Sequence, residues 1–164
     1  MADVLLGLGS NIPPKSKNLK NAIKLLSKHC MIEAVSNIYS SLSLLKDNQE
    51  DYFNIVVMVK TDFSPLALLK FLKNIEISLG RIDTGRWNSR IIDIDILDYN
   101  NQIIDMKELA VPHLEMHKRS FVLYPLRDIM PDYKHPLFKK DIITMINELD
   151  DDLNITILGR LHWQ

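Results

Sequence analysis

The chain has 164 residues, with 20 Lys and Arg against 21 Asp and Glu, a net charge of −1 and a hydrophobic content of 46%. This length and composition fit one globular domain over residues 1–164, and the near-neutral charge argues against a general nucleic-acid binder. No apolar run approaches the ~18 residues of a membrane helix, and the N-terminus has no signal-peptide pattern, so we expect a cytoplasmic protein without a membrane partner. The one cysteine, Cys30, excludes an internal disulfide.

Strands and helices alternate along the first hundred residues. Short β-branched or apolar runs indicate the strands, and apolar residues at spacings of three and four indicate the helices. Ser16 is a candidate N-cap, and Ser64 followed by Pro65 is a second helix start. In chain order we predict a strand at 4–8, a helix at 16–29, strands at 31–39 and 52–60 around a loop at 40–51, a helix at 65–79 ended by Gly80, a loop at 81–90 and a strand at 91–99.

This β-α-β-β-α-β order is that of an α/β (α+β) ferredoxin-like fold. After it we expect a C-terminal extension with a short hairpin strand near 102–104, a loop at 111–113, one or two helices and a last strand at 154–158. Gly7 and Gly9 are interpreted as a turn that ends the first strand. A phosphate loop is the weaker interpretation because Ile12 stands where the dinucleotide fingerprint needs a third glycine.

Asp93 and Asp95 are the sharpest local feature. Residues two apart in a strand face the same way, so both carboxylates project from one face while Ile92, Ile94 and Ile96 occupy the other. Carboxylate oxygens suit Mg²⁺, which also takes substrate phosphates and water. Taken alone, the motif is better explained as a half-exposed strand with acidic outward residues.

The preceding loop favours a phosphate site. Three of the six arginines, Arg81, Arg86 and Arg90, come directly before the acidic pair, and their planar guanidinium groups match phosphate oxygens. Acids for metal and arginines for phosphate are what phosphoryl transfer requires. The alternative is an ion-pair cluster on a solvated face, which Trp87 and the glycines at 80 and 85 make less favourable than a lid over a site.

Four further residues could contact a substrate. His113 and Arg119 suit phosphate contact, because a zinc site built on His113 and His117 has no evident third ligand. Tyr52 and Asn54 lie on one face of a strand and could stack on a flat heterocycle and bind its polar edge, although core packing of Tyr52 is the stronger interpretation from these residues alone.

Together these residues resemble the 6-hydroxymethyl-7,8-dihydropterin pyrophosphokinase family of folate biosynthesis, along nearly the whole chain. The most specific segment is 90–97, Arg-Ile-Ile-Asp-Ile-Asp-Ile-Leu. The other matching segments are Gly-Leu-Gly-Ser-Asn at 7–11, Tyr39, Asp-Tyr-Phe-Asn at 51–54, Ile-Glu at 75–76, Gly-Arg at 80–81, Arg-Trp at 86–87, Val-Pro-His at 111–113, Arg-Ser-Phe at 119–121 and Tyr-Pro-Leu at 124–126.

The resemblance implies a ferredoxin-like fold and transfer of the β,γ-pyrophosphate of ATP to the pterin hydroxymethyl group, with release of AMP. Asp93 and Asp95 would bind two Mg²⁺ ions. No strong general base is evident, and Asp95, acting through the metal-bound hydroxyl, is the candidate for that role. Catalysis would depend on Arg81, Trp87, Arg90 and Asp95. ATP would be bound by Glu76, Arg81, Trp87, Arg90, Ile96, His113 and Arg119, and the pterin by Ser41, Leu42, Leu44, Tyr52, Asn54 and Phe121.

The chain departs from the family pattern at three places: Asn88-Ser89, Leu114 and the loop start at 41–43, where prolines or an aromatic residue are common. Without those prolines the loops are less restricted, which affects the ATP side of the site. We expect a monomer that acts on ATP and the pterin. The alternatives are a ferredoxin-like module that binds single-stranded RNA, which would need exposed aromatics and a basic face, and an inactive relative that binds nucleotide only.

Overall fold

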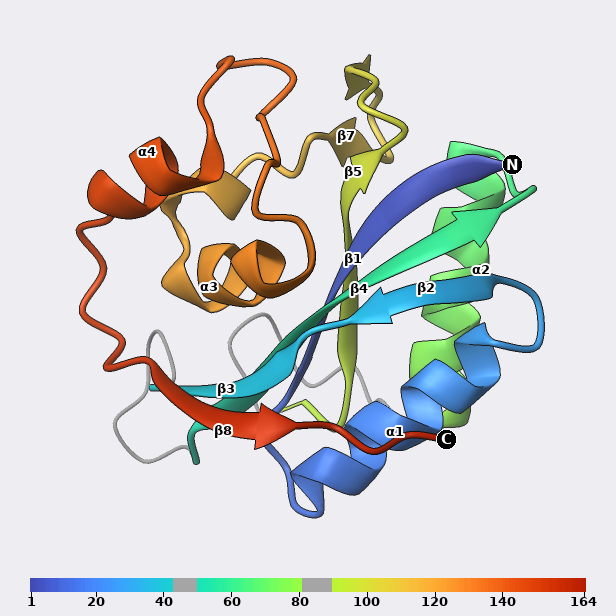
Figure 1. Cartoon of the computed structure of the whole chain (residues 1–164). Helices are drawn as coiled ribbons and strands as arrows, with labels where there is room; N and C mark the ends of the chain where they lie inside the picture. The colour runs from blue at the N-terminus through green and yellow to red at the C-terminus, as the bar shows by residue number, and fades with distance from the viewer. Residues whose placement is uncertain (43–49, 81–89) are drawn as a thin grey trace.

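A computed structural model describes residues 1–42, 50–80 and 90–164, and a twisted antiparallel sheet is its central feature (Figure 1). The elements of the first part are β1 (Ala2–Ser10), α1 (Lys15–Leu26), β2 (Met31–Val35), β3 (Asn37–Ser41), β4 (Tyr52–Thr61), α2 (Pro65–Ser78) and β5 (Asp93–Tyr99). The later elements are β6 (Ile104–Asp105), β7 (Ala110–Val111), the 3₁₀ helix η1 (Met116–Lys118), α3 (Ser120–Ile129), α4 (Ile142–Asn147) and β8 (Thr156–Arg160).

The strand order is β5-β1-β4-β3-β8, and β2 pairs with the other half of β4. The order confirms the predicted ferredoxin-like core, because β2 and β3 together occupy the place of one strand. They separate at Ser36, a buried residue whose hydroxyl accepts a hydrogen bond from the Val56 amide at 2.9 Å. The single strand predicted at 31–39 is therefore wrong at this point.

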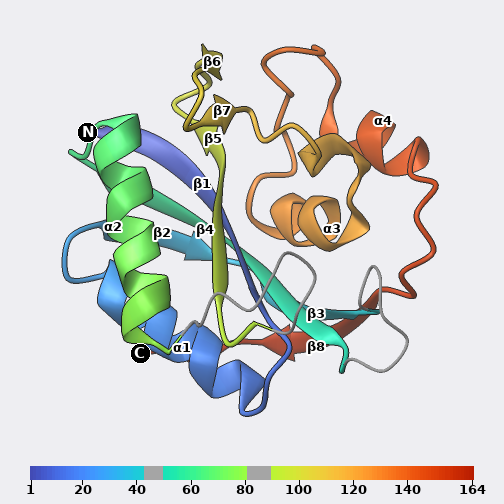
Figure 2. The same ribbon diagram turned by 180° about the vertical axis from the view of Figure 1, so that it is seen from behind.

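Two apolar clusters lie on opposite faces of the sheet. Alternate residues of β1 show the division, since Leu6 belongs to the cluster beneath α1 and α2 and Leu5 to the cluster beneath α3. Ile92, Ile94 and Ile96 all lie in the α1–α2 cluster, as their spacing predicts, and Cys30 is buried there too. Figures 1 and 2 show α1 and α2 on one side of the molecule and α3 and α4 on the other.

Helix α2 begins and ends as the sequence predicts. The Ser64 hydroxyl accepts a hydrogen bond from the Ala67 amide at 3.4 Å, Pro65 is the first helical residue, and Gly80 follows with a φ of 97°. Helix α1 instead begins at Lys15 after Pro14, so the prediction of Ser16 as its cap is wrong. No helix among the described residues is long and apolar enough to span a membrane.

Three other boundaries differ from the predictions. Strand β1 continues through Gly9 and Ser10, which pair with Asn54 and Phe53, so the turn assigned to this segment is wrong. The short strand near 102–104 is β6, which pairs with β7 in a separate two-stranded sheet. The last strand, β8, starts at Thr156, two residues after Asn154, whose φ is 52°.

Candidate active site

Asp93 of β5 lies at one end of a row of paired residues that crosses the sheet. Asp93 pairs with Gly9 of β1, Gly9 pairs with Asn54 of β4, and Asn54 pairs with Tyr39 of β3. Paired residues share a face, so the side chains of Asp93 and Asn54 lie on the same side of the sheet, about 10 Å apart at two strand spacings. Asp95 pairs with Gly7 in the next row on the same face. The predicted common face of the two aspartates is confirmed.

Gly9 leaves the space that the Asn54 side chain occupies. A Cβ atom on residue 9 would lie 2.8 Å from Oδ1 of Asn54 and 3.5 Å from Cδ1 of Tyr52. The Asn54 amide is buried, and its Nδ2 donates to the hydroxyl of Ser41 at 3.0 Å. Ser41 pairs in turn with Tyr52 in the sheet. Three of the predicted pterin residues, Ser41, Tyr52 and Asn54, therefore form one contiguous group beside Gly9.

Helix α3 brings two more predicted residues to this face. It packs on β3 and β4, and Phe121 in its first turn contacts the cluster that contains Val56 and Leu97. The guanidinium carbon of Arg119 lies 5.5 Å from the centroid of the Phe121 ring. A cation and an aromatic ring thus stand together at the start of α3.

His113 links the loop after β7 to β5. Its backbone amide donates to the Leu97 carbonyl at 2.9 Å, and its ring Nδ1 accepts from the Glu115 amide at 3.1 Å. Burial and the charge of Arg119 lower the pKa of His113, whereas Glu115 and Asp93 act in the opposite direction. A neutral ring whose Nδ1 accepts a hydrogen bond carries its proton on Nε2, which is then the donor available to a ligand. His113 therefore lies within electrostatic range of both Arg119 and Asp93.

His117 has a different environment. Its ring centroid lies 4.6 Å from that of Phe138 and 5.8 Å from that of His135, so it belongs to an aromatic group beside α4. Within residues 1–42, 50–80 and 90–164, no group of three His, Cys, Asp or Glu side chains could hold a metal ion. The zinc alternative for His113 and His117 gains no support.

Arg90 is fixed through its backbone at the start of β5. Its amide donates to Oδ1 of Asn11 at 2.7 Å, and the Asn11 amide donates to the Arg90 carbonyl at 3.0 Å. Both residues are buried, with 7% of Arg90 exposed. Asn11 follows β1 directly, so this pair joins the end of β1 to the segment that leads into β5. Asn11 is a positioning residue that no spacing rule identifies, although it lies in a segment that matches the family.

Two predicted nucleotide-site residues lie on the other side of β5. The Ile96 side chain is buried in the α1–α2 cluster, away from the carboxylate face, so only its backbone is available to a ligand. The Glu76 carboxylate comes from α2 and accepts a hydrogen bond from the Ile94 amide at 2.8 Å. Leu42 is exposed, and its amide donates to the Leu153 carbonyl. Arg81, Arg86, Trp87 and Leu44, with the departure at Asn88-Ser89, lie outside the described residues.

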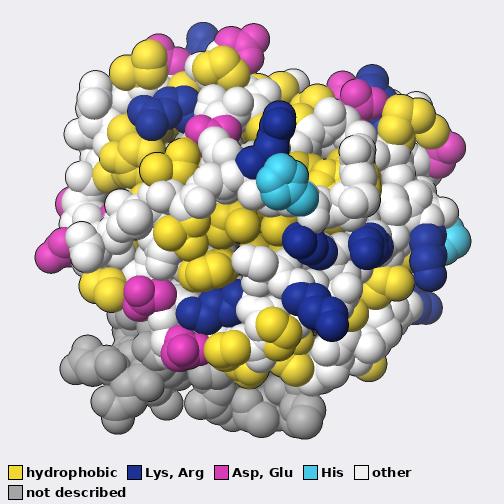
Figure 3. Space-filling model, turned by 60° about the horizontal axis from the view of Figure 1, so that its bottom comes forward, with side chains coloured by type: hydrophobic (Ala, Val, Ile, Leu, Met, Phe, Trp, Pro, Cys, Tyr) yellow, Lys and Arg dark blue, Asp and Glu magenta, His cyan; other side chains and the backbone are white. Residues whose placement is uncertain are grey.

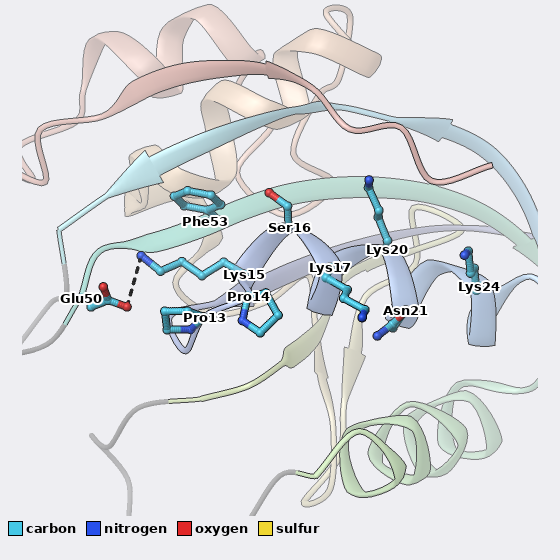
Figure 4. Close-up of a pocket in the computed structure, with 10 residues that line it drawn as sticks. All are labelled: Pro13, Pro14, Lys15, Ser16, Lys17, Lys20, Asn21, Lys24, Glu50 and Phe53. Carbon is cyan, nitrogen blue, oxygen red and sulfur yellow. Dashed lines mark ion pairs between the residues drawn. The ribbon is translucent and has the colours of Figure 1, made fainter.

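A lysine-lined cavity of about 720 Å³ lies elsewhere, between the start of α1 and β4. Figure 4 shows its lining, in which Lys15 forms an ion pair with Glu50 at 3.8 Å, and Figure 3 shows lysine and arginine side chains gathered at the end of the molecule that carries α1. Phe53 lines this cavity, and it faces the opposite side of β4 from Tyr52 and Asn54. The basic cavity is therefore separate from the site described above.

Comparison with known proteins gives a consistent match. Residues 5–131 match the family model described as 7,8-dihydro-6-hydroxymethylpterin-pyrophosphokinase (HPPK). The chain is 39% identical over 142 residues to 2-amino-4-hydroxy-6-hydroxymethyldihydropteridine pyrophosphokinase of Aquifex aeolicus, covering 87% of this chain and 89% of that protein. It is 44% identical over 133 residues to the folic acid synthesis protein FOL1 of Dictyostelium discoideum, covering 81% of this chain and 20% of that longer protein.

Solved structures share the fold. A crystal structure of Plasmodium falciparum HPPK-DHPS (wild type with pteroate) has a TM-score of 0.73 at 20% identity, covering 90% of this chain and 44% of the other. A crystal structure of HPPK-DHPS in complex with substrates has a TM-score of 0.71 at 20% identity, covering 89% and 43%. The present chain thus spans less than half of these two-part proteins, and at this identity the likeness concerns the fold.

Proposed function

The chain belongs to the 7,8-dihydro-6-hydroxymethylpterin-pyrophosphokinase family and is therefore a pyrophosphokinase, and we propose that it transfers the β,γ-pyrophosphate of ATP to the hydroxymethyl group of 6-hydroxymethyl-7,8-dihydropterin. The products are AMP and the pterin diphosphate, in a step of folate biosynthesis. The row from Asp93 through Gly9 to Asn54 carries this proposal. It places the Asp93 carboxylate about 10 Å from the polar and aromatic side chains of Asn54 and Tyr52, a distance that a small ring system can span.

The pterin binds beside Gly9, against the side chains of Ser41, Tyr52 and Asn54. Tyr52 and Phe121 stack on its two faces, and Asn54, held by Ser41, forms hydrogen bonds with its polar edge. We also assign pterin binding to backbone groups near Leu42 and Leu44, as the family resemblance implies. The support is that Tyr52, Asn54 and Ser41 are contiguous on β3 and β4 and that α3 carries Phe121 to the same sheet face.

The ATP phosphates bind between the start of β5 and the start of α3. Arg90, Arg119 and the Nε2–H of neutral His113 supply positive charge and donors, together with Arg81 and Trp87. The nucleoside lies along the outer edge of β5, beside Glu76 and the backbone of Ile96. The opposing effects of Arg119 and Asp93 on the His113 pKa support the convergence of these three residues.

Asp93 and Asp95 fit Mg²⁺ by their chemistry and placement. Two carboxylates on one sheet face, both partly exposed, offer hard oxygen ligands of the kind Mg²⁺ prefers, and phosphates and water would supply the remaining ligands. We propose that they hold two Mg²⁺ ions, which would neutralise phosphate charge and polarise the oxygens that react.

The transfer itself needs placement more than strong bases. The pterin hydroxyl oxygen forms a bond to the β-phosphorus, the bond from that phosphorus to the oxygen it shares with the α-phosphate breaks, and AMP leaves with the electron pair. The hydroxyl proton passes to a carboxylate oxygen of Asp95. The arginines and His113 hold the phosphates in line during this exchange.

The test supplies the purified chain with ATP, MgCl₂ and 6-hydroxymethyl-7,8-dihydropterin and separates the nucleotides. AMP formed in step with pterin consumption supports the proposal, whereas ADP, or no turnover while the Aquifex relative is active under the same conditions, contradicts it. Tight binding of single-stranded RNA without nucleotide affinity would favour a binding module instead. We further propose a monomer that acts in the cytoplasm, and a dimeric mass by light scattering would contradict the first part.

A further inference from the structure

Glu76 lies on the buried face of α2, where the helical pattern predicts an apolar residue. Leu68, Leu72 and Ile75 form the buried stripe of this helix, and Glu76 continues that stripe with only 4% of the residue exposed. Burying a carboxylate costs several kcal/mol unless hydrogen bonds compensate it. The contacts of this carboxylate should therefore reveal why it is there.

One oxygen of Glu76 binds the backbone of β5. Oε2 accepts a hydrogen bond from the Ile94 amide at 2.8 Å, a charge-assisted bond to the residue between Asp93 and Asp95. Strand β5 lies at the edge of the sheet among the described strands, and it pairs with β1 on its inner side. The Ile94 amide on the outer side consequently meets a side chain where an inner strand would meet another strand.

On its inner side this end of β5 pairs with β1 from Asp93 to Ile96, and on its outer side it receives the Glu76 carboxylate. The pairing of β1 with β5 shifts register between Leu5 and Leu6, so the aspartate end is separated from the rest of the ladder by an irregularity. Its partners in β1 include Gly7 and Gly9, which present no side chain. A one-residue slip here would turn both carboxylates to the opposite face.

We propose that Glu76 is a positioning residue that holds Asp93 and Asp95 in the orientation needed for the divalent cation. Its carboxylate fixes the outer edge of β5 between the two aspartates, while the Asn11–Arg90 pair fixes the strand just before them. The inference rests on the proposed function, since it assigns Glu76 to the cation site through β5 in addition to its place beside the nucleoside.

The test compares Glu76→Gln with Glu76→Met. Glutamine keeps an oxygen that can accept from the Ile94 amide, and methionine fills the same volume without one. Glu33→Met, at an exposed glutamate of β2, is the matched control. Two quantities are measured: hydrogen exchange of the Ile94 amide by NMR without ligands, and the Mg²⁺ concentration that gives half-maximal turnover.

We expect Glu76→Met to increase exchange at Ile94 and to raise the half-saturating Mg²⁺ concentration, each by about tenfold to a hundredfold, as loss of an outer-sphere support of a metal site does. Glu76→Gln should change both by less than about threefold. This second variant keeps the proposal testable if the methionine variant does not fold.

Two results would overturn the proposal. If Glu76→Gln loses Mg²⁺ response as strongly as the methionine variant while Ile94 stays protected, the charge acts directly on a ligand. If Glu76→Met exposes the Ile94 amide and leaves the Mg²⁺ response unchanged, the bond serves the fold alone. In both cases the wild-type chain is active, whereas a wild-type chain that produces no AMP overturns the proposed function itself.

Discussion

Replacing Gly9 by alanine tests the placement of the pterin directly. The added Cβ would lie 2.8 Å from Oδ1 of Asn54, a distance that real Cβ contacts essentially never show, so the amide must move. The amide is held by its 3.0 Å bond to Ser41 and is buried, and loss of a buried hydrogen bond costs about 1–3 kcal/mol. We therefore expect kcat/KM for the pterin to fall by about tenfold to a hundredfold, with a much smaller change in KM for ATP.

Gly7→Ala is the matched control on the same strand. Its Cβ would meet the Leu97 side chain at 3.4 Å, an ordinary contact, so we expect less than about a threefold effect. Gly7→Ala should change the free energy of unfolding little, because alanine suits a strand better than glycine does, whereas Gly9→Ala should lower it by about 1–3 kcal/mol because the buried Asn54 amide is displaced. Steady-state kinetics and thermal unfolding measure both. A Gly9→Ala enzyme with normal pterin kinetics would refute the placement of the ring beside Asn54.

Two further predictions concern the carboxylates and a buried histidine. Asp95→Ala should lower turnover about a thousandfold or more without unfolding the chain, because the apolar face of β5 is untouched. The control Asp3→Ala, which removes an exposed ion pair on β1, should be active. Near-normal AMP formation by Asp95→Ala would mean that the metal site lies elsewhere. Burial lowers the pKa of His135 to about 4, and the unfolded chain keeps its ordinary value near 6.5, so the unfolded state binds the extra proton as pH falls between these values. The free energy of unfolding should then decrease by up to about 3 kcal/mol from pH 6.5 to pH 4, and a urea series in which His135→Asn keeps the full wild-type pH dependence would contradict this cause.

Local patterns predict most of the fold. The serine and proline at 64–65 and Gly80 mark the ends of α2, and period-two alternation places the isoleucines of β5 in the core. The misplaced boundaries depend on contacts between distant segments. Ser36 divides β2 from β3 because its side chain bonds to Val56, and β1 runs through Gly9 because that residue pairs with Asn54.

The site divides in the same way. Asp93 and Asp95 follow from strand geometry alone, since a spacing of two is sufficient to put them on one face. The bonds from Glu76 to Ile94 and from Asn11 to Arg90 join residues 18 and 79 positions apart, and no spacing rule connects them. The pairing of Gly7 and Gly9 with the aspartates of β5, and of Gly9 with Asn54, is likewise seen only in the tertiary structure.

The most direct test of the central claim follows the reaction of the wild-type chain with ATP, MgCl₂ and 6-hydroxymethyl-7,8-dihydropterin by ³¹P NMR. We expect AMP and a pterin diphosphate in equal amounts, with no ADP, because the bond to the β-phosphorus is the one exchanged. Resonances of ADP and a pterin monophosphate would contradict it, since they would place the attack at the γ-phosphorus.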